Sequence, residues 1–370
     1  MKRSTATSLS TLLLAVLAST APAVEPAQND VAAWITEIDG HYSLDDNGNI
    51  AEVDLTSSWV NDADLEKLTF APHLRRIDLS YTWVTDIGLE HLKPLENIEE
   101  LRLHYTENIT DGGIAHIKHW KKLKHLDVRG TKATSRVFEH VAQIETLEFL
   151  DVGFSRVTDD GFEHLADLVK LTSLGFGGNK MSGTALPLLR LLPSLKHLDV
   201  GGQQRTDSGL WALALSDFNL ESIETLAGLE SLNAEASKVS DRGLEQLTSL
   251  SRLESLDLSR TSVSGRGVKA LSALPNLKHL RLWQCEKVGD EIAAHLPALK
   301  KVETLDLAET GVSDEVLDRL GEMPELRQVF LGGTKASAEG VERFRTGHPH
   351  VRITWWEKPP EPERFNNVAP

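Results

Sequence analysis

Cysteine is almost absent from this 370-residue chain, which contains only Cys285. A single cysteine permits no internal disulfide. Cysteine chemistry also needs a partner, such as a histidine base or further thiols around a metal. No second thiol exists, and His295 follows ten residues later. We therefore ask whether Cys285 is a nucleophile, a metal ligand or part of a larger pattern.

Long apolar runs are lacking too. The run TLLLAVLA (11–18) is far shorter than the ~20 residues that a membrane-spanning helix needs. It follows Lys2 and Arg3 and precedes Ala21-Pro22-Ala23, which is the layout of a secretory signal peptide. No cysteine follows it for lipid attachment. We expect residues 1–23 to be removed and the mature chain to be exported to a periplasm or to the medium, without a membrane span.

Basic residues are also scarce relative to acidic ones. The chain has 39 Lys and Arg against 55 Asp and Glu, a net charge of −16. Nucleic acids and anionic membrane surfaces both require basic patches. The composition therefore argues against either as a partner.

What the chain has in abundance is the pattern L-x-x-L-x-L, whose copies mostly begin 24 or 25 residues apart. The copies begin at Leu74, Ile98, Leu123, Leu147, Leu171, Leu195, Leu229, Leu253, Leu277, Val302 and Leu326, with related segments at Ile50 and His350. The first residue of each copy is called position 1 below. A sustained period of this length indicates a solenoid.

A second signature follows each strand-like segment, as in VTDIGLEHL (84–92) and VSDRGLEQL (239–247). Ser or Thr suits a helix N-cap, and the next Asp suits the positive end of the helix dipole. Each unit is therefore predicted to be a short strand, a turn and a short helix. No unit can bury its own apolar face, so the units must stack.

Position 9 explains Cys285. The residues at this position are mostly small and polar: Thr82, Thr106, Thr131, Ser155, Asn179, Ser237, Thr261, Cys285, Thr310 and Thr334. The chain turns here, and such side chains can pair backbone groups that the turn leaves free. We interpret Cys285 as a structural member of this column.

These repeats resemble those of leucine-rich repeat proteins, best the short bacterial kind of 24 residues. The stretch LRLWQCEKVGDE (280–291) is also similar to the cysteine-containing repeats of F-box partners. No F-box-like segment precedes the repeats, so a ubiquitin-ligase role is not implied. The resemblance covers about residues 50 to 356. It implies an α/β solenoid: a horseshoe with a parallel β-sheet on its concave face, short helices on its convex face, and protein binding as its usual function. An extracellular animal protein of this class would usually carry cysteine-stapled ends, so a bacterial source is expected.

The repeats need a cap at each end. We predict an N-terminal cap over residues 24–49, made of a helix and a hairpin that turns at Asn47-Gly48. Asn29 or Asp30 is expected to begin this helix and Gly40 to end it. The helix has one apolar face, formed by Val31, Trp34, Ile35 and Ile38. The solenoid is expected to span 50–356 in about 12–13 repeats, with a disordered proline-rich tail at 357–370.

One repeat is ten residues longer than the others, between Leu195 and Leu229. We interpret the surplus, around residues 213–228, as a lengthened helix or a loop on the convex side. Such an insertion in a regular array is also a candidate contact site.

Position 5 points into the concave face and is rich in Asp. Arg102 and Arg281 stand between two Asp residues each, and each is expected to serve both carboxylates. Asp127 and Asp151 are left as an unpaired acidic stretch, next to a bare floor made by the glycines of 175–178 and 201–202. The simpler alternative is that Asp is tolerated at a solvated sheet position.

The candidate partner-binding residues on the concave face form two groups, one central and one near the C-terminal end where aromatic residues accompany arginine. They are His125, Asp127, Arg129, Phe149, Asp151, Phe154, Asp199, Arg281, Trp283, Phe330 and Trp356.

No catalytic, cofactor or metal site is predicted. The glycine-rich segment 265–270 is in phase with the helix signature of other repeats, so the repeat explains it. Histidines recur at one helix position, but neighbouring helices lie too far apart to share one ion. The leading hypothesis is an exported, monomeric, protein-binding scaffold. The alternatives are a cell-envelope component that binds divalent cations or wall polymers and, least favoured, a hydrolase.

Overall fold

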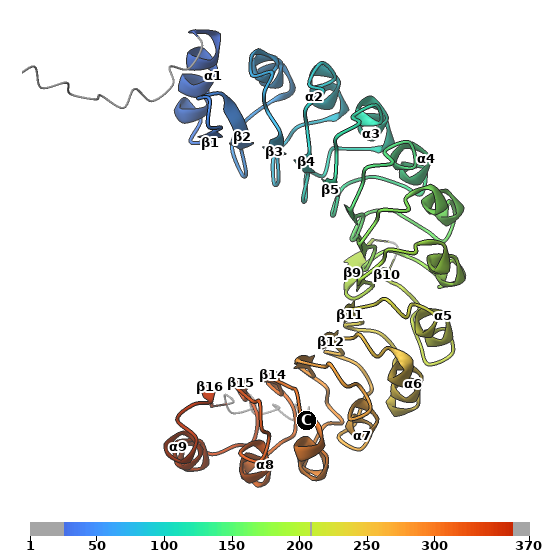
Figure 1. Ribbon diagram of the computed structural model, residues 1–370, viewed down its shortest axis with the longest axis vertical. Coiled ribbons are helices and arrows are strands. Elements are labelled where there is room, and N and C mark those ends of the chain that lie inside the picture. The colour runs from blue at the N-terminus through green and yellow to red at the C-terminus, as the bar shows by residue number, and fades with distance from the viewer. Residues whose placement is uncertain (1–25, 208, 358–370) are drawn as a thin grey trace, which may run out of the picture.

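The computed structural model describes residues 26–207 and 209–357. The signal peptide predicted at 1–23 and nearly all of the predicted tail lie outside these ranges. The chain forms a horseshoe with one continuous sheet along its inner side and the helices along its outer side (Figure 1). The predicted α/β solenoid is confirmed.

The inner sheet of the described residues has 14 strands in the order of the sequence, with a gap in the numbering between β8 and β11. Within this sheet, only β1 and β2 pair antiparallel. The others are parallel, because each repeat returns the chain in the same direction. The strands are β1 (His41–Leu44), β2 (Ile50–Asp54), β3 (Arg76–Asp78), β4 (Glu100–Arg102), β5 (His125–Asp127), β6 (Phe149–Asp151), β7 (Ser173–Gly175), β8 (His197–Asp199), β11 (Ser231–Asn233), β12 (Ser255–Asp257), β13 (His279–Arg281), β14 (Thr304–Asp306), β15 (Gln328–Phe330) and β16 (Arg352–Thr354).

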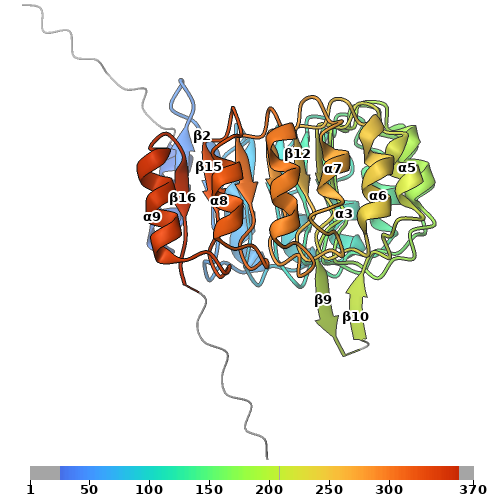
Figure 2. The same ribbon diagram turned by 90° about the horizontal axis from the view of Figure 1, so that it is seen from below.

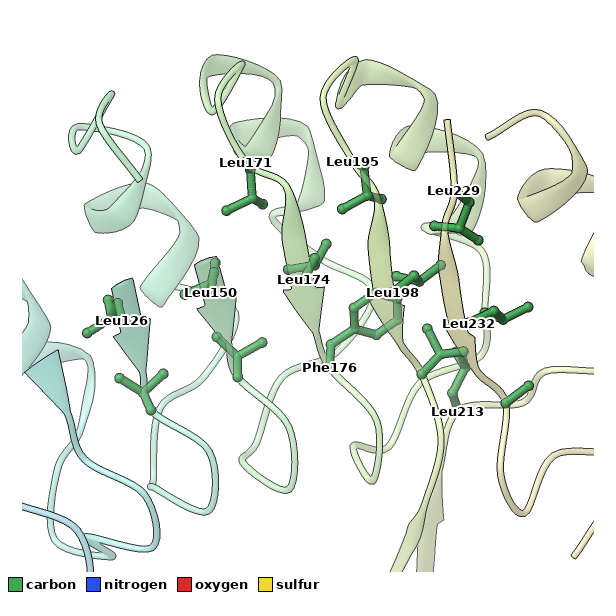
Figure 3. Close-up of a cluster of buried hydrophobic side chains, with 14 of the residues drawn as sticks. Leu126, Leu150, Leu171, Leu174, Phe176, Leu195, Leu198, Leu213, Leu229 and Leu232 are labelled. Carbon is green, nitrogen blue, oxygen red and sulfur yellow. The ribbon is translucent and has the colours of Figure 1, made fainter. Parts of the chain in front are cut away.

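Leucine side chains at positions 1 and 4 fill the space between the sheet and the helices. Figure 3 shows them stacked from one repeat to the next, with Leu150, Leu174 and Leu198 in line. Each of these three is at most 2% exposed. Burying a leucine stabilises a fold by roughly 1.5–3 kcal/mol, and here each leucine is covered mainly by its neighbours in adjacent repeats. The stacking therefore holds the repeats together.

The outer side carries short α-helices, and several repeats have a 3₁₀ turn instead. The α-helices after the cap are α2 (Asp86–His91), α3 (Asp111–Ile117), α4 (Val137–Val141), α5 (Leu220–Glu224), α6 (Asp241–Gln246), α7 (Val268–Leu271), α8 (Asp314–Leu320) and α9 (Ala338–Gly347). The 3₁₀ helices are Asp62–Phe70, Phe162–Asp167, Leu186–Leu191, Leu247–Ser249, Asp290–Ala294 and Leu296–Ala298. Within the described ranges, none of the helices has the length and apolar character needed to cross a bilayer.

The Thr/Ser-Asp signature does more than cap its own helix. Thr85 and Thr110 each cap a helix by accepting from a backbone N–H two residues later, as predicted. In addition, the carboxylate of Asp86 accepts from both the N–H and the hydroxyl of Thr110, at 2.8 and 2.5 Å. The same two-bond link joins Asp241 to Ser264 and recurs in most repeats. We call this series the Asp–Thr/Ser ladder.

The N-terminal cap is the expected helix followed by a hairpin. Helix α1 (Pro26–Glu37) packs Val31, Trp34 and Ile35 into the core. The hairpin turns between β1 and β2, where Gly48 has a φ of 81°. The expectation that Asn29 or Asp30 begins the helix is wrong, because α1 begins at Pro26. Proline suits the first turn of a helix, where its missing N–H has no partner to lose.

The long repeat differs from its prediction. The surplus residues form a hairpin, β9 (Gln203–Thr206) with β10 (Gly209–Ala212), directly after β8. Figure 2 shows it projecting past the edge at which the strands end, not on the convex side. Residues 213–228 resume the normal repeat: Leu213 pairs with Met181 and is buried (Figure 3). The alternation of apolar Leu213 and Leu215 was the overlooked signal.

The interpretation of position 9 is confirmed. Cys285 is fully buried, and its thiol donates to the carbonyl of Leu258 at 3.1 Å. In the preceding repeat, the hydroxyl of Thr261 donates to the same carbonyl at 2.6 Å. Burial raises the pKa of the Cys285 thiol, which disfavours the reactive thiolate.

Candidate functional site

Side chains at positions 3, 5 and 7 face the inside of the horseshoe, because strand residues alternate between faces. The position 5 Asp residues have a structural role. Asp78, Asp127 and Asp151 each accept from the N–H two residues later, at 2.7 to 2.9 Å. The same bond recurs at Asp54, Asp199, Asp257 and Asp306. Asp is therefore not merely tolerated here: it pairs an N–H where the strand ends.

An ion-pair chain crosses the first strands. Arg76 lies 3.1 Å from Glu52 and 2.9 Å from Glu100, and Glu100 lies 2.6 Å from Arg102. These side chains line a hollow of about 280 Å³ that also includes Tyr42 of the cap. This charged hollow forms the N-terminal end of the concave face.

The expected sharing of arginines is only half right. Arg281 lies 2.8 Å from Asp257 and 3.7 Å from Asp306, as predicted. Arg102 instead binds Glu100 closely and lies 3.9 Å from Asp78, with no ion pair to Asp127. Glu100 stands two residues before Arg102 on the same face, so it is the nearer carboxylate.

The prediction that Asp127 and Asp151 form an unpaired acidic stretch is wrong for Asp151. Arg129 lies 3.2 Å from Asp151 and 3.4 Å from Asp199. Its guanidinium also covers the ring of Phe154, 4.3 Å from the centroid. We call these four residues the Arg129 cluster. The single guanidinium of Arg129 thus serves both carboxylates from within the chain.

The prediction of a bare floor made by glycines is also wrong. A Cβ on Gly178 would lie 2.7 Å from the ring of Phe154, and one on Gly202 would meet the same ring. A Cβ on Gly175 would lie 2.8 Å from the carboxyl of Asp151. The glycines admit the side chains of the Arg129 cluster, so no partner backbone can approach there.

A second hollow lies between the Arg129 cluster and the charged hollow. We call it the Tyr81 hollow. Its volume is about 410 Å³, and its lining is Thr56, Asp78, Ser80, Tyr81, Arg102, His104, His125, Asp127 and Phe149. Among the predicted site residues, His125, Asp127 and Phe149 are thus brought together.

Aromatic groups form much of this lining. His125 stacks on Phe149 with ring centroids 3.9 Å apart, and burial lowers the pKa of His125. Tyr81 stacks on Tyr105 at 5.7 Å. His104 meets the edge of Tyr81 and lies 3.1 Å from the carboxylate of Asp127. Burial, and next the nearby carboxylate of Asp151, raise the pKa of Asp127.

Sequence reasoning missed Tyr81, His104 and two neighbouring tryptophans. Trp59 and Trp83 are 87% and 70% exposed, at position 10 of consecutive repeats. Tyr81 occupies position 8, like Phe154, and both have positive φ, at 58° and 51°. Large side chains seldom adopt this conformation. Aromatic residues at position 8 were the available signal, because the strand register aims them along the edge of the concave face.

The predicted C-terminal group is not one cluster. Arg281 is on β13 and Trp283 follows it, whereas Trp356 follows β16, three strands further along the sheet. Trp356 covers Gly332 and is 46% exposed. Phe330 is half-buried on β15. At about 4.8 Å per strand, the two tryptophans are spaced too widely to contact one partner side chain.

Comparisons with known proteins agree with this fold. A family model described as "Leucine Rich repeat" matches residues 70–93 and 250–272. No curated protein sequence matches the chain. These two segments coincide with repeats of the solenoid, and the chain has the leucine-rich repeat fold.

Several solved structures are similar. An internalin (InlF) of Listeria monocytogenes has 18% identity and a TM-score of 0.53, over 89% of this chain and 94% of that one. A leucine-rich repeat protein of Leptospira interrogans has 22% identity and a TM-score of 0.52, over 78% and 74%. The mouse RP105/MD-1 complex gives 14% identity and a TM-score of 0.52, over 78% and 48%. At these identities, the likeness concerns the fold.

Proposed function

We propose that this chain is an exported scaffold that binds a partner protein on the concave face of β1 to β6. The Tyr81 hollow carries this proposal: it is a depression on the inner face whose lining combines aromatic rings with charged groups. Aromatic and arginine side chains are enriched where proteins bind one another. His125, Asp127 and Phe149 contact the partner directly.

The other predicted site residues have different tasks in this proposal. Arg129, Asp151, Phe154 and Asp199 hold one another and form a rigid floor next to the hollow. Arg281, Trp283, Phe330 and Trp356 supply separate contacts on the opposite arm of the horseshoe, which Figure 1 shows across the open interior from the N-terminal strands. A partner that fills the interior contacts both arms.

The remaining assignments rest on the sequence and the fold. The layout of residues 1–23 supports export to a periplasm or to the medium. Internalins supply a bacterial example of the fold, and the fold is typical of binding scaffolds rather than enzymes. The chain acts as a monomer and needs no cofactor. A role in binding divalent cations receives no support from the concave carboxylates, because each of Asp151, Asp199 and Asp257 already lies beside an arginine.

Capture experiments with matched variants test which face binds. The double variant His125→Ala/Phe149→Ala is compared with Arg319→Ala on the convex helix α8, whose side chain is paired only with Glu322. Both tagged proteins are used to capture partners from envelope extracts of the source organism, with quantitative mass spectrometry as readout. We expect the concave variant to lose its specific partner at least tenfold and the convex variant to retain it. The reverse result refutes the proposal.

A further inference from the structure

The repeats allow one part of the concave face to be compared with another by shifting along the sheet. The Arg129 cluster uses position 7 of one repeat (Arg129), positions 5 and 8 of the next (Asp151 and Phe154), and position 5 two repeats further on (Asp199). The strands β5 to β8 that carry it are in uniform parallel register. The cluster is thus a fixed pattern of positions that can be sought elsewhere.

Shifting this pattern back by three repeats places it on the Tyr81 hollow. Asp151 maps onto Asp78, Phe154 onto Tyr81 and Asp199 onto Asp127, in strands with the same register. Arg129 maps onto Thr56. The hollow therefore has the two carboxylates and the aromatic ring of the pattern, and lacks the guanidinium. All four of these residues line the hollow.

The middle strand differs between the two places. Gly175 separates Asp151 from Asp199, whereas Arg102 separates Asp78 from Asp127. Arg102 does not replace the missing guanidinium, because it lies 2.6 Å from Glu100 and 3.9 Å from Asp78. Asp127 has only the His104 ring, at 3.1 Å, and a backbone N–H as its partners. Two carboxylates and Arg102, which is shared with Glu100, leave the hollow short of positive charge.

The ring of Tyr81 is placed to receive a cation. One of its faces stacks on Tyr105, so the other is on the side of Thr56. Tyr81 is 53% exposed. A guanidinium over an aromatic face is attracted by the ring's electrons, and a paired carboxylate adds to this attraction. The chain realises this combination at Phe154 with its own Arg129.

We propose that the Tyr81 hollow binds an arginine side chain of the partner protein, in the place that Arg129 occupies three repeats further on. This rests on the proposed function and specifies the partner: it presents an exposed arginine between Tyr81 and the carboxylates of Asp78 and Asp127. The acidic net charge of −16 favours the approach of such a basic partner. Burial raises the pKa of Asp127, which means that its charged form is poorly stabilised in the free chain. A bound guanidinium would stabilise that carboxylate.

Capped tripeptides test this inference without the partner. The probes are acetyl-Gly-Arg-Gly-amide and the same peptide with citrulline, which keeps the shape of arginine and lacks its charge. Titrations of the purified chain, followed by NMR of the Tyr81 and His104 rings, measure the binding. We expect saturable shifts with the arginine peptide at millimolar concentrations and at least tenfold weaker binding of the citrulline peptide. No binding of the arginine peptide, or equal binding of both, overturns the inference.

Thr56→Arg is the decisive variant, because it supplies the missing guanidinium from within the chain. We expect it to reduce binding of the arginine peptide at least tenfold, whereas Ser262→Arg, which adds the same charge at an exposed site on another repeat, leaves binding unchanged. Tyr81→Ala removes the ring without adding backbone strain, since Ala236 adopts the same φ of 58° at this position of its own repeat. It should weaken binding at least fivefold. Undiminished binding by folded Thr56→Arg or Tyr81→Ala refutes the assignment.

These results separate the two proposals. If the arginine peptide fails to bind but the His125→Ala/Phe149→Ala variant still loses its captured partner, the concave face remains the binding surface and only the arginine assignment is wrong.

Discussion

Removing one carboxylate of the Asp–Thr/Ser ladder should weaken the solenoid measurably. Asp241 is the best position, because it is the first residue of α6, near the middle of the array, and is partly buried. Its carboxylate accepts from the N–H of Ser264 at 2.7 Å and from the hydroxyl at 2.6 Å. The variant Asp241→Ala loses both bonds and leaves that N–H without its partner.

The expected magnitude follows from those two bonds. A hydrogen bond to a charged group contributes about 1.5–3 kcal/mol, and water at this partly buried site replaces part of it. We expect Asp241→Ala to lower the free energy of unfolding by about 3 kcal/mol. Asp241→Asn keeps one acceptor for the N–H and can donate to the hydroxyl, so about 1 kcal/mol should be lost. Asp318→Ala, at an exposed position on α8, should change stability by less than about 0.5 kcal/mol.

Guanidinium unfolding followed by circular dichroism provides the assay for these three variants. Solenoids can unfold in steps, so amide hydrogen exchange is measured as well. The Ser264 amide should exchange faster in Asp241→Ala than in the wild-type chain. Equal stability of Asp241→Ala and Asp318→Ala, with unchanged protection at Ser264, would refute the role of the ladder in joining repeats.

Three further predictions concern a glycine, the cysteine and a histidine. A Cβ on Gly177 would lie 1.8 Å from the carbonyl oxygen of Gly201, so Gly177→Ala should lower the free energy of unfolding by about 3 kcal/mol or more. In the control Gly347→Ala, the added Cβ meets nothing within 4 Å, so no stability should be lost. Urea unfolding of both variants measures the difference. Cys285→Thr introduces the commonest residue of position 9 and should lower the free energy of unfolding by less than about 1 kcal/mol. The wild-type thiol should react with a disulfide reagent only after unfolding, because it is buried and its pKa is raised. Burial lowers the pKa of His125 in the folded chain, so protonation of this ring favours the unfolded state, and wild-type stability should fall as the pH drops below about 6.5. The urea midpoint should fall less steeply between pH 7 and pH 5 for His125→Gln than for the wild-type chain. Parallel slopes for the two proteins would contradict this reasoning.

The repeat period by itself determines most of the fold. Apolar residues at positions 1, 4 and 6 recur every 24 or 25 residues, and only stacking buries them all. The same register identified Cys285 as structural, since a buried thiol and a buried threonine can donate to the same carbonyl. Local sequence rules were sufficient to predict these features, because each repeat places the same position in the same surroundings.

The placement of the insertion and the pairing of charges depended on the tertiary structure. The hairpin of residues 203–212 has the polar sequence of a loop, and its site became clear only because Leu213 enters the shared core. Arg129 reaches Asp199 across the strand of Gly175, a link between residues 70 positions apart. A long side chain can choose among carboxylates on several strands, so the register alone does not decide its partner.

The sequence by itself thus determined the solenoid, its concave face and the residues available on that face. The tertiary structure decided which of those residues neutralise one another and which remain available to a partner. The physical reason is that backbone register places a side chain on a face, whereas distances across several strands decide its electrostatic partners. Arg129 and Thr56 have the same register, and only the structure shows that one is part of a satisfied cluster while the other lines a hollow.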